Sequence, residues 1–78
     1  MSLYDLLKPD IQRMVNSLDK HDKGNIYPLV MQEVERSLID LVLKETGYNY
    51  VHAAKALGIS RSTLYRRIEV LGIQPTKT

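Results

Sequence analysis

The chain has 78 residues, with 11 Lys and Arg against 9 Asp and Glu, two His and no Cys. The lack of cysteine excludes a disulfide framework and a thiolate zinc site, and no apolar run is long enough to cross a membrane. A chain of this length is expected to form a single domain over residues 1–78, and domains this small often need a partner subunit to complete their core.

The first predicted helix runs from roughly Leu6 to Leu18. Its apolar residues recur at steps of three and four and form one stripe: Leu7, Ile11, Met14, Val15 and Leu18. Pro9 is tolerated only near a helix start, which favours this boundary. Ser2 and Asp5 have the spacing of a capping box, so an earlier start with a kink at Pro9 stays open.

A polar stretch containing Gly24 follows at residues 19–25 and is predicted to be a loop. Asn25 is a suitable N-cap for a second helix. That helix is expected to continue to about Thr46 and to stop at Gly47, since glycine favours helix C-termini. We assign residues 1–46 to dimerisation helices.

The second helix carries more apolar residues than one face needs. Its stripe comprises Ile26, Leu29, Val30, Val34, Leu38, Leu41 and Val42. Ile39 and Leu43 add apolar side chains outside that stripe. A helix that is apolar most of the way round needs cover on more than one side, and we expect a second subunit to supply part of it. A monomeric four-helix core is the alternative. The expected dimerisation residues are Leu7, Ile11, Met14, Leu18, Val34, Leu38, Leu41 and Val42.

Two shorter helices are predicted within residues 47–78, before a short C-terminal tail. The third helix spans about Tyr50 to Leu57 with Asn49 as its cap, and the fourth begins after Ser60 and ends near Leu71–Gly72. A three-residue turn containing Gly between two helices is typical of a helix-turn-helix. The expected inward residues are Ala53, Ala54, Leu57, Ile59, Leu64 and Ile68. A purely structural helical hairpin would need the same inward residues.

Charge alone does not separate the two possibilities, but charge together with the outward surface of the fourth helix favours DNA binding. Residues 1–46 hold six basic and eight acidic residues, a balance of −2, whereas residues 47–78 hold five basic residues and one acid, a balance of +4. The outward arc of the fourth helix holds Ser62, Tyr65, Arg66 and Glu69, with Arg61 and Thr63 at its N-terminal tip and Arg67 on a flank. Arginines and hydroxyls at a helix N-terminus suit DNA, although a solvated basic helix would also explain Arg66 and Arg67.

The residue types do not favour an enzyme. No carboxylate pair, nucleophile–base set or metal-ligand cluster stands out, and His21 and His52 lie far apart. The four glycines form no phosphate-binding loop. We therefore expect no catalysis, no metal and no cofactor.

Residues 25–74 closely resemble the Fis-type helix-turn-helix, a family that includes the C-terminal domains of nitrogen regulatory protein C-type, sigma-54-dependent activators. The most specific match runs from Ala53-Ala54 through Gly58-Ile59-Ser60-Arg61 to Thr63-Leu64 and Leu71-Gly72-Ile73. The resemblance implies an all-α fold of four helices. The first two would form a dimer core, and the last two would present recognition helices to successive major grooves of double-stranded DNA.

By position in the motif, the resemblance assigns base and phosphate contacts to Ser60, Arg61 and Thr63. Arg66 and Arg67 match basic positions of the recognition helix, and residues 49–52 match a segment that contacts the DNA backbone. Tyr65 departs from the family, since some members have a basic residue there. The expected DNA-contacting residues are Asn49, Tyr50, His52, Ser60, Arg61, Ser62, Thr63, Tyr65, Arg66 and Arg67.

The resemblance leaves two functions. The stretch at residues 60–67 is more similar to the activators, which would make this chain a DNA-binding domain whose ATPase and receiver domains belong to the same protein. The alternative is a self-standing nucleoid protein that bends DNA. Both imply a cytoplasmic, nucleoid-associated protein. A dimerisation or protein-interaction module without DNA binding is a third, lesser possibility.

Overall fold

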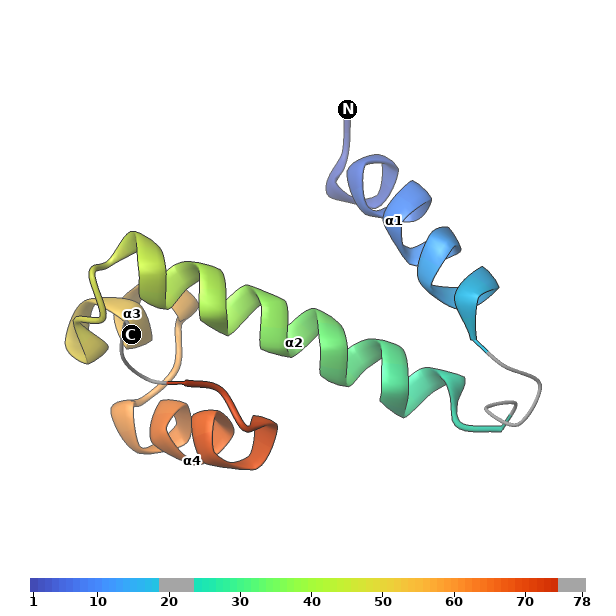
Figure 1. Cartoon of the computed structure of the whole chain (residues 1–78). Coiled ribbons are helices and arrows are strands. Elements are labelled where there is room, and N and C mark those ends of the chain that lie inside the picture. Colours follow the sequence, from blue (N-terminus) through green and yellow to red (C-terminus); the bar gives the residue numbers. More distant parts are fainter. Residues whose placement is uncertain (19–23, 75–78) are drawn as a thin grey trace. The chain divides into compact units, whose positions relative to one another are not determined.

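The computed structural model describes residues 1–18 and 24–74, and the described part is built from helices without strands. The four helices are α1 (Leu3–Ser17), α2 (Ile26–Glu45), α3 (Tyr50–Leu57) and α4 (Arg61–Leu71) (Figure 1). The predicted all-α class and the number of helices are confirmed. The chain divides into two compact units within α2, Met1–Glu33 and Val34–Thr78, because the C-terminal half of α2 shares a core with α3 and α4.

Helix α1 begins three residues before the predicted start at Leu6, and its capping explains why. The Ser2 hydroxyl accepts a hydrogen bond from the backbone N–H of Asp5 at 3.1 Å, and the Asp5 carboxylate accepts the Ser2 backbone N–H in return. This capping box satisfies N–H groups that a helix start otherwise leaves without partners. Pro9 therefore lies inside α1, and the earlier of the two possible starts is the correct one.

Helix α2 begins at Ile26, directly after the predicted cap residue Asn25, and ends at Glu45 just before the predicted stop. In the segment that follows α2, the Tyr48 backbone N–H donates to the Leu43 carbonyl at 2.7 Å, and this bond closes the last turn of the helix. The loop predicted for residues 19–25 lies outside the described residues, except for its last two positions.

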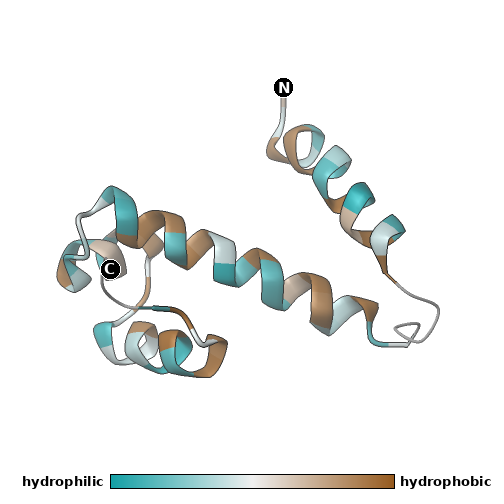
Figure 2. Cartoon of the chain, viewed as in Figure 1, coloured by the Kyte–Doolittle hydropathy of each residue, from teal (hydrophilic) through white to brown (hydrophobic). Residues whose placement is uncertain are grey.

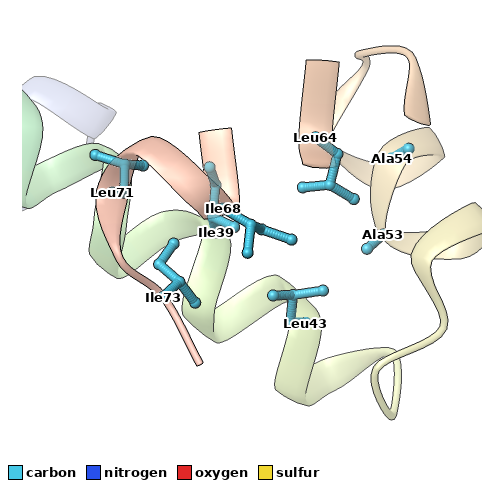
Figure 3. Packing of buried hydrophobic residues seen from close by; sticks show 8 residues of the cluster. All are labelled: Ile39, Leu43, Ala53, Ala54, Leu64, Ile68, Leu71 and Ile73. Atoms are coloured by element: carbon cyan, nitrogen blue, oxygen red, sulfur yellow. The ribbon is translucent and has the colours of Figure 1, made fainter. Parts of the chain in front are cut away.

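The core of the second unit consists of eight buried apolar residues from three helices and the segment after α4. These are Ile39, Leu43, Ala53, Ala54, Leu64, Ile68, Leu71 and Ile73 (Figure 3). Helix α2 contributes Ile39 and Leu43, which the hydrophobic pattern had placed outside its main stripe. The stripe residues Leu38 and Leu41 are instead 52% and 58% exposed. Helix α2 thus packs on α3 and α4 with the face that carries Ile39 and Leu43, and the face that carries Leu38 and Leu41 stays exposed.

Helices α3 and α4 end in the same way. Gly58 and Gly72 have φ of +75° and +67°, a left-handed conformation that glycine adopts without steric cost. The next residues, Ile59 and Ile73, donate their N–H groups to the carbonyls of Ala54 and Ile68. This is the Schellman motif, in which the residue after the glycine returns an apolar side chain to the helix. Ile73 is buried in this way.

We expect Leu64→Ala to lower the free energy of unfolding by about 2–5 kcal/mol, because Leu64 is fully buried and its loss leaves a cavity. Urea unfolding at matched protein concentration measures the change. Ile68→Val, expected to cost about 0.5–1.5 kcal/mol, covers the case in which the alanine variant does not fold. Val70→Ala is the exposed control, and equal losses for Leu64→Ala and Val70→Ala would contradict the core described above.

Candidate nucleic-acid interface

Helices α3 and α4 are joined by the three residues Gly58, Ile59 and Ser60, as predicted. Ala53 and Ala54 on α3 and Leu64 on α4 are all buried in the common core, and Figure 3 shows Leu64 beside Ala54. Two alanines on one helix and a leucine on the other allow close approach, because the small side chains make room for the larger one. The burial of Leu64 and Ile68 leaves the opposite side of α4 open to solvent.

A cluster of hydroxyl groups forms the N-terminal tip of α4. The Ser60 hydroxyl accepts the Thr63 backbone N–H at 3.1 Å, which confirms Ser60 as the N-cap. It also lies 2.9 Å from the Thr63 hydroxyl and 3.2 Å from the Ser62 hydroxyl. The tip therefore combines the partial positive charge of a helix N-terminus with several hydrogen-bonding oxygens, and Arg61 is exposed beside them. Such a tip is suited to an anionic, hydrogen-bonding partner.

The exposed arc of α4 matches the prediction from its sequence. Ser62, Tyr65, Arg66 and Glu69 are all exposed, while Leu64, Ile68 and Leu71 on the other side are buried. Within this arc the arginine at position 66 follows the tip by about one turn and can reach the same partner surface.

The start of α3 combines a cap with an aromatic contact. The Asn49 side chain accepts the His52 backbone N–H at 3.1 Å, which confirms Asn49 as the N-cap, and the His52 side chain is exposed. Tyr50 is half-buried, and its ring meets that of Tyr65 edge to face with centroids 5.1 Å apart. Two predicted contact residues from different helices thus form one aromatic pair, a relation that the sequence analysis missed.

Arg67, which is also a predicted contact residue, has a partner in α2. Its Nε and Nη2 groups donate to the two carboxylate oxygens of Glu35, each at 2.6 Å. Hydrogen bonding from Arg67 holds the pKa of Glu35 below its ordinary value, against the opposing effect of burial. Sequence reasoning missed Glu35, although it precedes the inward-facing Ile39 by one helical turn and so shares its face. A DNA contact by Arg67 stays a prediction.

None of the predicted dimerisation residues is among the eight buried core residues, although Val42 packs against that core. Leu7, Leu38 and Leu41 are each at least half exposed, and α1 contains no buried residue. Figure 2 shows hydrophobic segments along both α1 and α2. Partly exposed positions complete the set: Ile11, Met14, Leu18, Val34 and Val42. Whether a second subunit covers them stays a prediction.

Two further properties apply to residues 1–18 and 24–74. None of their helices has the length and apolar content that a membrane span requires. No group of three or more His, Asp or Glu side chains among them could hold a metal ion.

Comparison with known protein families matches residues 30–71 to the family described as "Bacterial regulatory protein, Fis family". A protein named DNA-binding protein Fis from Histophilus somni is 34% identical over 71 residues, which cover 91% of this chain and 72% of the relative. The protein of the same name from Pasteurella multocida is 35% identical over the same shares. That from Buchnera aphidicola is 34% identical over 86% of this chain and 68% of its own length. No solved structure matches the chain.

The Glu35–Arg67 pair makes a prediction about pH. Because the pKa of Glu35 is lowered by folding, the pair stabilises the fold above the ordinary glutamate pKa of about 4.3, and this contribution is lost as the pH falls through the lowered value. Glu35→Gln should lower Tm by roughly 2–5 °C at neutral pH, since the pair is only partly shielded from solvent. Thermal unfolding at several pH values should show this difference shrinking in acid.

Glu69→Gln makes the same charge change on the exposed arc of α4 and serves as the control. A Tm difference for Glu35→Gln that stayed constant between neutral pH and acid would show that the ion pair does not stabilise the fold.

Proposed function

The chain belongs to the Fis family of bacterial regulatory proteins, and we propose on this premise that it is a dimeric, sequence-specific protein that binds double-stranded DNA through α4. The observation that carries the proposal is the two-sided character of α4. One side is buried through Leu64, Ile68 and Leu71, and the other exposes Arg61, Arg66 and Ser62 near the N-terminal end of the helix. A helix of this kind fits the major groove, whose width admits one α-helix.

Each exposed group of α4 has a contact that suits its chemistry. Arg61 is a long, planar donor at the tip and can bond both O6 and N7 of a guanine. The hydroxyls of Ser62 and Thr63, with the backbone N–H groups of the first turn that Ser60 does not cap, can bind phosphate oxygens or base edges. Arg66 lies further along the arc and would meet the phosphate backbone. Residues 49–52 at the start of α3 would contact the backbone on the other side of the groove.

A second copy of the chain would cover the apolar surface that a single copy leaves open. Side chains spaced by three and four residues form two stripes, Tyr4, Leu7, Ile11, Met14 and Leu18 in α1 and its following residue, and Tyr27, Met31, Val34, Leu38 and Leu41 in α2. Stripes with this alternating spacing favour packing of helices side by side. A two-fold dimer would then place two copies of α4 about one DNA turn apart, as a palindromic site requires.

The self-standing protein is the better supported of the two family functions. The 71 residues matched in the Histophilus somni relative make up 72% of it, so that relative has only about 99 residues. This length leaves no room for an ATPase or a receiver domain. The match also extends well before residue 30, and so includes much of the segment that holds α1. We therefore propose a Fis-like nucleoid protein that bends DNA, and the activator domain becomes the second candidate.

The second candidate rests on residues 60–67 alone, which resemble the corresponding segment of sigma-54-dependent activators. Circularly permuted DNA fragments distinguish the two, because a bending protein shifts the mobility of the complex with the position of the site. An interaction module without DNA binding is distinguished more simply, since it would give no gel shift with any duplex at low salt.

Arg61→Ala is expected to lower affinity for the preferred duplex by roughly 1–3 kcal/mol and to have much less effect on random DNA, because the lost contact is to a base edge. Binding isotherms on both duplexes at several salt concentrations measure the difference. Wild-type affinity should fall steeply with salt on either duplex, as phosphate contacts require. An equal loss on both duplexes would show that Arg61 does not read bases.

The chain should form a dimer at micromolar concentration, and Leu41→Asp should convert it to a monomer, because a carboxylate buried without a partner costs several kcal/mol. Leu41 lies outside the core of α2, α3 and α4, so that core should still form. Sedimentation equilibrium measures the association. Val51→Asp is a matched exposed control on α3 and should stay dimeric. A Leu41→Asp variant that dimerised as tightly as the wild type would contradict this dimer surface.

A further inference from the structure

Glu35 and Arg67 form an ion pair between α2 and α4, two helices that also share the apolar core. They lie 32 residues apart in sequence, and the carboxylate accepts two hydrogen bonds of 2.6 Å from the guanidinium. Their side chains are 35% and 33% exposed, which places the pair at the edge of the core. Two parallel bonds of this kind fix the relative orientation of both groups as well as their distance.

The apolar contacts alone define the orientation of α4 less sharply. Ile39 of α2 and Ile68 of α4 are buried in the same cluster (Figure 3). Such contacts are not directional, because apolar side chains gain from burial in many arrangements. Arg67 directly precedes Ile68 in sequence. Its ion pair therefore restrains α4 next to the residue through which α4 enters the core that it shares with α2.

The position of Arg67 also separates it from the surface that would meet DNA. Arg66 lies on the exposed arc with Ser62 and Tyr65, whereas Arg67 lies on the flank toward α2. A phosphate contact by Arg67 would have to replace two charge-assisted bonds and leave the Glu35 carboxylate without its partner. Such an exchange gives little net gain, since one anion is substituted for another.

We propose that Arg67 is a positioning residue and that Glu35 is a specificity-determining residue, although neither contacts DNA. Their ion pair sets the orientation of α4 on α2, and thereby the angle at which the exposed tip enters the groove. This inference rests on the proposed function. If α2 also forms the dimer, the same pair fixes the separation of the two recognition helices and hence the spacing between half-sites.

The pair has a second consequence for charge. Glu35 neutralises one of the three arginines of α4, leaving Arg61 to meet bases and Arg66 to meet phosphate. Removal of the carboxylate would release a guanidinium that could approach any DNA sequence. Glu35→Gln should therefore strengthen binding to random DNA and weaken discrimination, with a salt slope larger by about one unit.

The decisive experiment is a reversal of the pair in the full chain. We would compare the wild type with Glu35→Arg, Arg67→Glu and the double variant carrying both changes. The probes are a duplex selected from a random pool by the wild type and a random duplex of equal length, each at several salt concentrations. Circular dichroism and Tm establish that each variant is folded.

Each single reversal should reduce the affinity ratio between the two duplexes by roughly tenfold, because it places like charges together and turns α4. The double variant should recover most of that ratio. In parallel, Arg66→Gln should lower the salt slope by about one unit, whereas Arg67→Gln should leave it unchanged. A merely structural pair would alter Tm without changing the affinity ratio.

The inference is overturned if Arg67→Gln lowers the salt slope as Arg66→Gln does and the double variant stays impaired, since Arg67 would then contact phosphate. It is also overturned if the folded single variants keep the wild-type affinity ratio. A wild type that bound neither duplex at low salt would instead overturn the proposed function, and the inference with it.

Discussion

The burial of Leu64 is the interaction on which the rest of the second unit depends. Its side chain is fully buried in the cluster that joins α2, α3 and α4, beside two alanines whose small size makes the space. Because α4 has only eleven residues, it would be marginal in isolation, and its stability comes from this apolar face. The same contact determines which residues are left on the outside. The recognition surface is therefore a consequence of the packing on its reverse side.

Features that depend on neighbouring residues could be predicted from the sequence, whereas features that join distant segments could not. Asn49 and Ser60 were predicted as caps because their side chains bond backbone groups only three residues away. The start of α1 was left open, since Pro9 and the Ser2 capping box gave opposing local signals. The Glu35–Arg67 pair was missed, because it depends on how two helices face each other. The spacing of apolar residues likewise predicted one wide apolar stripe on α2. It did not show which of these apolar residues pack on α4.

The division of α2 into two faces connects folding with recognition. Ile39 and Leu43 share the core with α3 and α4, while Leu38 and Leu41 on the other side of α2 are exposed in the single chain. If the exposed face forms the dimer, the C-terminal half of α2 links the dimer interface to α4. Motion of α4 relative to its counterpart would then be limited to what the packing on α2 allows. A short chain can in this way set the distance between two half-sites on DNA, which is much longer than any single side-chain contact.

The placement of Ile73 has a consequence for where the domain ends. The family match stops at residue 71, yet the core continues two residues further, because the turn after α4 carries the buried Ile73 back onto Ile68. A fragment cut at the end of the recognition helix would expose the apolar surface beneath Ile73 and leave the last carbonyls of α4 without that N–H donor. The smallest unit able to hold α4 in its native form is thus set by the closing turn. Grafting α4 with its packing partners onto another protein would require that turn to be included.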